Sequence, residues 1–103
     1  MEKVIRNGKV AVIISGEEGG AGWYSWHREE QLIFHPKIVE MVESNRHSEL
    51  TQIWVYKNTG INASTVGRDS LIIVWIPEGT AFTIEVDEGV EQIITADDLQ
   101  FTT

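Results

Sequence analysis

The segment from Gly16 to His27 holds the residue types in this chain that are best suited to binding chemistry. It reads Gly-Glu-Glu-Gly-Gly-Ala-Gly-Trp-Tyr-Ser-Trp-His, with four of the nine glycines and three of the nine aromatic residues of the chain. Glycine lets the backbone approach another group closely, while Trp and Tyr rings are large flat surfaces with one polar atom each. The segment could therefore stack on a flat ligand such as a nucleobase and offer glycine amides to an anionic group.

We predict a ligand-binding set in this segment and directly after it: Gly20, Gly22, Trp23, Tyr24, Trp26, His27 and Arg28. Arg28, or Arg68 farther along the chain, could pair with a phosphate. The neighbouring Glu17 and Glu18 would repel that phosphate, and no Lys-Ser or Lys-Thr pair follows the glycines, so the segment is not a Walker loop. A tight corner whose two Trp residues pack on the core explains the glycine spacing better than a phosphate cradle does.

Signatures of catalysis and of metal binding are missing from the sequence. The three histidines, His27, His35 and His47, lack the i, i+4 spacing that places two ligands on one helical face. We expect His35, beside a helix start, to be a local hydrogen-bonding partner. There is no cysteine and no Gly-x-Ser-x-Gly elbow, and the carboxylates of Glu29-Glu30 and Asp97-Asp98 are chain neighbours that rarely converge on one atom. We predict no catalytic residue, metal or cofactor; nothing supports an enzyme, although that class stays open.

The charge of the chain is concentrated in its last third. All eight Lys and Arg residues lie at or before Arg68, and the formal net charge is −8. The later carboxylates are Asp69, Glu78, Glu85, Asp87, Glu88, Glu91, Asp97 and Asp98. This distribution disfavours direct binding of nucleic acid or of an anionic membrane and suits a basic protein partner. The alternative is an acidic surface that only keeps the domain soluble.

The first half of the chain predicts a hairpin followed by a helix. Residues 3–6 and 9–14 flank Asn7-Gly8, a pair that is typical of a two-residue hairpin turn, and the apolar second arm is expected inside a sheet. Residues 23–27 are a poor opening for a helix, and residues 31–35 suggest a brief strand or an extended lead. A helix is expected from Pro36 to about Asn45, with an apolar stripe. The stripe consists of Ile38, Met41, Val42 and, less clearly, Val39.

The second half predicts one more helix and then strands. Residues 48–57 fit a helix with Ser48 as N-cap and Leu50, Ile53 and Trp54 on one face, although 53–56 would also suit a strand. Residues 71–76 are apolar on both faces, as in a central strand. After a turn at 77–80, residues 81–86 alternate, with Phe82, Ile84 and Val86 facing inward. A turn at 87–89 leads to a shorter strand over 91–95.

These elements predict one α+β domain over residues 1–103. We expect a mostly antiparallel β-sheet, built from the N-terminal hairpin and the C-terminal meander, with one or two helices packed on one face. The chain has no signal peptide, no membrane-spanning run and no cysteine, which favours the cytoplasm. Exposed sheet edges and the apolar tail residues Leu99 and Phe101 favour a homo-oligomer.

Three blocks of this sequence carry a resemblance: GAGWYSW at 20–26, FHPKIVEMVE at 34–43 and WIPEGTAFTI at 75–84. They are similar to blocks in a group of small uncharacterised proteins from phage and bacterial genomes, which has no assigned activity and therefore no site residues to carry over. The resemblance implies a phage origin. Small phage proteins of this size are often accessory, including counter-defence proteins that block a host effector or sequester its signal.

Together these observations predict a small non-catalytic binding protein in the cytoplasm, that of the host if the chain is phage-encoded. The first hypothesis is that it sequesters a small, nucleotide-like ligand through the Gly16–His27 segment. The alternative is an acidic inhibitor or nucleic-acid mimic that blocks a basic effector protein through the C-terminal third. Mimicry should weaken steeply as salt screens it, whereas stacking of a small ligand should respond much less.

Overall fold

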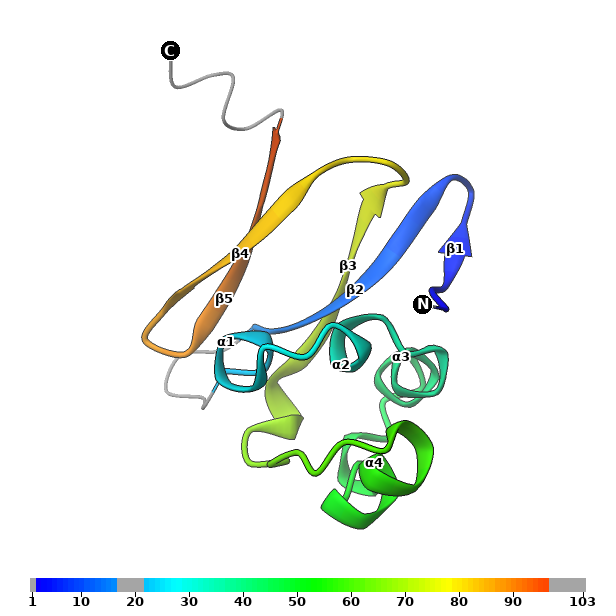
Figure 1. The fold of residues 1–103 in the computed structure, drawn as a ribbon, viewed down its shortest axis with the longest axis vertical. Coiled ribbons are helices and arrows are strands. Elements are labelled where there is room, and N and C mark those ends of the chain that lie inside the picture. The colour runs from blue at the N-terminus through cyan, green and yellow to red at the C-terminus, as the bar shows by residue number, and fades with distance from the viewer. Residues whose placement is uncertain (1, 17–21, 97–103) are drawn as a thin grey trace.

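Short helices pack against a three-stranded antiparallel sheet, and a separate two-stranded hairpin lies beside it (Figure 1). The computed structural model describes residues 2–16 and 22–96. Their elements run in the order β1 (Ile5–Arg6), β2 (Lys9–Ser15), α1 (Tyr24–His27), α2 (Gln31–Phe34), α3 (Pro36–Glu43), η1 (His47–Glu49), α4 (Gln52–Thr59), η2 (Arg68–Ser70), β3 (Leu71–Pro77), β4 (Phe82–Asp87) and β5 (Val90–Thr95). The predicted class, α+β with antiparallel strands, is confirmed, although the strands divide between two sheets.

The N-terminal hairpin forms as predicted. Asn7 and Gly8 both have positive φ, 52° and 74°, which is the conformation of a type I′ turn. Arg6 pairs with Lys9 across this turn, and β2 lies in the middle of the order β1-β2-β3. Residues 10–15 are all buried; helices α2 and α3 pack against this sheet, and β5 also contacts β2.

Strand β3 forms where predicted, but the expected central position is wrong. It pairs with β2 from Leu71↔Ser15 to Pro77↔Lys9, and within residues 2–16 and 22–96 no strand pairs with its other edge. Ile72 is accordingly 45% exposed. The reason is the turn that follows: Gly79 has a φ of 84°, and Thr80 N–H donates to Pro77 O at 3.1 Å. The chain leaves the sheet there, and β4 pairs with β5 instead of with β3.

The β4–β5 hairpin closes through a second two-residue turn, at Glu88 and Gly89, whose φ values are 52° and 86°. The predicted alternation places Phe82 and Ile84 against the core, where both are half-buried. Val86, expected to face inward as well, is 49% exposed near the tip of the hairpin.

Helix α3 is confirmed, and two shorter helices correct the sequence analysis. The His35 Nδ1 atom accepts a hydrogen bond from Lys37 N–H at 3.2 Å, so His35 caps the helix that Pro36 begins. Its buried face consists of Ile38, Val39, Met41 and Val42. Residues 31–34 are a helical turn, not a strand, in which Leu32, Ile33 and Phe34 are buried, and residues 24–27 are helical too.

Helix α4 is confirmed, with a different start and a different buried face. Thr51, not Ser48, is the N-cap: its Oγ1 accepts from Trp54 N–H at 3.1 Å. Gly60, with a φ of 78°, ends the helix. In this helix Val55 is buried, whereas Ile53 is 69% exposed. No helix in the described ranges has the length and apolar character to cross a bilayer.

Candidate functional site: a groove between β4 and the first two helices

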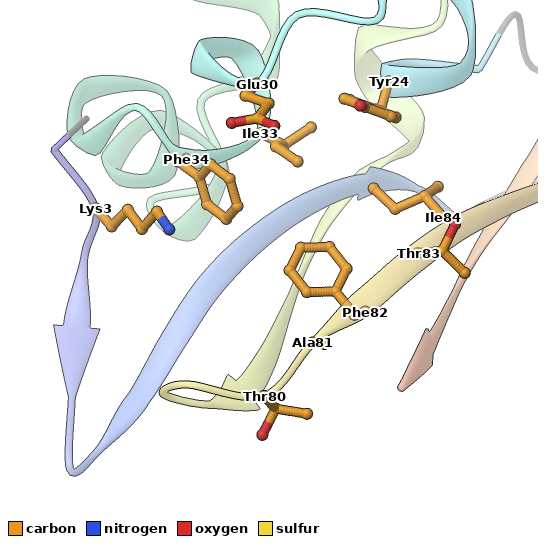
Figure 2. Close-up of a pocket in the computed structure, with 10 residues that line it drawn as sticks. All are labelled: Lys3, Tyr24, Glu30, Ile33, Phe34, Thr80, Ala81, Phe82, Thr83 and Ile84. Carbon is orange, nitrogen blue, oxygen red and sulfur yellow. The ribbon is translucent and has the colours of Figure 1, made fainter. Parts of the chain in front are cut away.

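A groove with a volume of about 350 Å³ separates the start of β4 from helices α1 and α2 (Figure 2). Residues from four parts of the chain line it: Lys3, Tyr24, Glu30, Ile33, Phe34, Thr80, Ala81, Phe82, Thr83 and Ile84. The β4–β5 hairpin contributes one wall, because β4 leaves the first sheet after the turn at 77–80. The groove therefore results directly from the division of the strands into two sheets.

Two aromatic rings are in edge-to-face contact at this groove. The rings of Phe34 and Phe82 lie 6.2 Å apart between centroids, with an interplanar angle of 79°. Phe34 is held by α2, where it is almost fully buried, while Phe82 is half-buried at the start of β4. Ile33 and Ile84 extend the apolar surface on the two sides (Figure 2). This edge-to-face arrangement leaves apolar walls for a flat or aliphatic group.

Two opposite charges stand at the rim of the groove. The Lys3 ammonium lies 4.5 Å from the centroid of the Phe34 ring, a cation–π distance. Glu30, which directly precedes α2, is exposed. Lys3 and Glu30 do not form an ion pair with each other, so both charges can interact with a ligand. Of the predicted binding set, Tyr24 lines the groove and brings a phenolic hydroxyl.

Trp23 has a structural role. Its side chain is 0% exposed, and its Nε1–H donates to Leu32 O at 2.8 Å, which ties α1 to α2. Its ring packs edge-on against His27, with centroids 5.2 Å apart. The ring therefore has no face open to a ligand. Within the candidate pair Trp23 and Trp26, the stacking prediction rests on Trp26, which is 60% exposed.

His27 connects α1 to the loop that follows α4. Its Nε2 accepts a hydrogen bond from Ser64 N–H at 3.0 Å, so Nδ1 carries the proton and donates to Trp23 O at 3.0 Å. Arg28 ends the helix with a φ of 57° and leaves its side chain exposed. Gly22 is buried, with a φ of 81°, and a Cβ added there would collide with Ser25 Oγ. Gly20 lies outside the described residues.

Glu91 does not belong to the acidic surface to which the sequence analysis assigned it. The residue is 2% exposed, and its carboxylate accepts hydrogen bonds from Ser15 N–H at 2.8 Å and Ser25 N–H at 2.7 Å. It thereby joins β5 to the end of β2 and to the start of α1. A buried carboxylate requires such donors, and nothing in the local sequence distinguishes this glutamate from its exposed neighbours.

A surface ion pair fixes β1 to helix α3. Arg6 Nη2 donates to Glu43 Oε1 at 2.9 Å, and the hydrogen bond from the Arg6 guanidinium holds the pKa of the Glu43 carboxyl below its usual value. The pair lies outside the groove. Across residues 2–16 and 22–96, no three His, Cys, Asp or Glu side chains gather in a way that could hold a metal ion.

The binding prediction from the sequence centred on the Gly16–His27 segment, of which Tyr24 lines the groove, and most of the groove's other residues were outside that prediction. Phe82 and Ile84 were predicted on the inward face of their strand, which was the one available signal. Lys3 and Phe34 were not singled out, and Glu30 was weighed only as half of a carboxylate pair, because their approach to β4 depends on contacts between distant parts of the chain. No protein-family model, curated protein or solved structure matches this chain.

Proposed function

We propose that this chain is a small non-catalytic binding protein whose site is the groove between β4 and helices α1 and α2. One observation carries the proposal: aromatic walls, with a lysine and a glutamate that do not pair with each other at the rim. A volume of about 350 Å³ lies within the usual range of pockets that hold small ligands or side chains. Such sites combine an apolar body with a few polar groups that orient the ligand.

Binding without turnover fits the residues at the groove. Its hydroxyl groups come from Tyr24, Thr80 and Thr83, and the ten lining residues include no histidine or cysteine. A threonine nucleophile needs an adjacent base or a lowered pKa, and Glu30 is an exposed carboxylate. The groove thus offers recognition groups without a nucleophile–base pair.

Two ligand classes remain as candidates for this groove. A nucleotide-like molecule would place its base against the half-buried Phe82 ring and its anionic group at Lys3. A segment of a basic partner protein would use the carboxylates of the β4–β5 hairpin, of which Glu85, Asp87 and Glu88 are exposed. Either class suits the accessory or counter-defence role in a host cytoplasm that the sequence resemblance implies.

Titration of the ¹⁵N-labelled protein tests whether the groove is a binding site. AMP and cyclic AMP serve as anionic flat probes, and adenosine serves as the neutral one. Ligand in the groove should shift the amide signals of Phe34, Phe82 and Ile84. Lys3→Gln should weaken the binding of AMP more than that of adenosine. Lys9→Gln makes an equal charge change at another exposed lysine and should leave the binding of both probes unchanged. If the shifts fall on Trp26 and Arg28 and not on the groove, the site is the exposed side of α1.

A further inference from the structure

Among residues 2–16 and 22–96, no strand receives the backbone hydrogen-bonding groups on one edge of β4. The Ala96 N–H donates to Ala81 O at 3.0 Å, which makes Ala81 and Ala96 a hydrogen-bonded pair. The register continues through Thr83↔Ile94 and Glu85↔Gln92. Because hydrogen-bonded and non-hydrogen-bonded pairs alternate in an antiparallel ladder, these residues direct their amides toward β5.

Phe82 and Ile84 therefore direct their N–H and C=O groups away from β5. In the part of the chain that the structure describes, no strand pairs with this second edge, and neither residue has another backbone partner. Both residues are half-buried and not sealed from water. Two donors and two acceptors at alternate residues are what an added strand requires.

This edge faces the groove. Successive side chains of a strand point to opposite faces, yet the first three residues of β4, Phe82, Thr83 and Ile84, all line the cavity. A cavity that is lined by residues from both faces of the strand runs along the edge of the strand and not over one face. Figure 2 shows the Phe82 ring pointing from β4 toward Phe34 and Ile33, with Lys3 at one side.

The negative charge of the β4–β5 hairpin favours a positively charged segment as the strand added beside β4. Thr83, Glu85 and Asp87 project from the face of β4 opposite to Phe82 and Ile84 and are exposed. From Asp69 to Ala96 the chain has no Lys or Arg. A strand added beside β4 would place alternate side chains next to Glu85, where cross-strand pairs of opposite charge are favourable and like charges are not. A second copy of this chain, with a formal net charge of −8, is a poor occupant for that reason.

We propose that the groove binds an extended segment of a basic partner protein, which adds as a strand to the free edge of β4. Apolar residues of that segment lie beside Phe82 and Ile84 and face Phe34, and Lys or Arg residues lie beside Glu85. This inference rests on the proposed function, because it assumes that the groove is a binding site, and it names the partner class.

The first test uses an acetylated, amidated peptide with the sequence Lys-Ile-Lys-Val-Lys and two N-methylated isomers. One isomer is methylated at Ile and Val, and the other at the second and third Lys. In an extended strand these two sets of amides point to opposite sides, so only one isomer should lose binding. Loss of binding in both isomers or in neither would overturn strand addition.

Hydrogen exchange identifies the edge on the protein. The bound peptide should slow exchange of the Phe82 and Ile84 amides, which have no backbone acceptor within the described part of the chain. The amides of Thr83 and Glu85, which already face β5, should change little and serve as internal controls. Slowing spread equally over all four would indicate general stabilisation and would contradict the proposal.

Reversing the charge of one glutamate at a time distinguishes specific pairing at Glu85 from an effect of the net charge of the protein. Glu85→Lys should weaken binding of the peptide by about fivefold. Added salt should reduce this difference in affinity between the variant and the native protein. Glu40→Lys makes the same change in net charge at an exposed position on α3 and should leave binding nearly unchanged. Equal losses of peptide affinity in Glu85→Lys and Glu40→Lys would overturn the proposal that Glu85 pairs with a basic residue of the peptide. If AMP shifts the groove amides and the peptide does not bind, the proposed function stands and this inference fails; if neither probe binds, both fail.

Discussion

The carboxylate of Glu91 accepts a hydrogen bond from the backbone N–H of Ser25 at 2.7 Å, although 66 positions separate the two residues in the chain. The other oxygen of the same carboxylate accepts from Ser15 N–H. One side chain of β5 thus holds both the end of β2 and the first turn of α1. It satisfies amides that would otherwise lie in the interior without a partner, which is costly.

Removing this carboxylate should therefore be among the most destabilising single changes. Glu91→Ala leaves two amides without acceptors and is expected to lower the free energy of unfolding by about 2–4 kcal/mol. Glu91→Gln retains one acceptor oxygen and should cost less. Urea denaturation measures both, with Glu88→Ala at the exposed hairpin turn as the control. If Glu91→Ala lowered the free energy of unfolding as little as Glu88→Ala, the role of Glu91 in joining β5 to β2 and α1 would be contradicted.

The two Trp residues of the predicted binding set should separate into a structural and a surface residue. Trp23→Ala removes a fully buried ring and its hydrogen bond to Leu32, and should lower stability by about 3–5 kcal/mol. Trp26→Ala should change stability by less than about 0.5 kcal/mol. Thermal unfolding followed by circular dichroism compares them. Comparable losses would mean that Trp26 also packs in the core.

Helix α3 offers a comparison of its two faces. Ile38 is 0% exposed, and Glu40 lies on the exposed side. Ile38→Ala should cost about 2–4 kcal/mol because it leaves a cavity against the sheet, whereas Glu40→Ala should cost little. Chemical denaturation of the two variants checks this, and similar small effects at both positions would show that the apolar stripe is not buried.

The Arg6–Glu43 pair predicts a small dependence of stability on pH. The hydrogen bond from Arg6 lowers the pKa of Glu43 in the folded state, so the unfolded state binds a proton more readily. The contribution is present above the unfolded pKa, about 4.3 for Glu, and is lost as the pH falls through the folded pKa. The stability difference between the native protein and Arg6→Gln should shrink over this acid range and also in high salt. A difference that is constant with pH would contradict the pair.

Sequence reasoning succeeded where local chemistry decides the structure. Asn7-Gly8 determines a turn, and Pro36 with an apolar stripe determines a helix, because both depend on neighbours along the chain. It failed for β3, whose apolar composition predicts burial on both faces but not which strands pair with its edges. It also failed for Glu91, since the amides that donate hydrogen bonds to this buried carboxylate belong to distant segments. The groove depends on the same long-range contacts, so only the inward face of β4 could be predicted.

The hairpin that forms one wall of the groove is fixed at both of its ends. The turn at 77–80 joins one end to β3, and Glu91 fastens the other to β2 and α1. The spacing between the walls is therefore set before any ligand arrives, and little ordering entropy is lost on binding. A residue that touches no ligand thus controls affinity: loosening Glu91 would change the spacing of the groove walls and weaken binding in the groove, with every contacting side chain still in place.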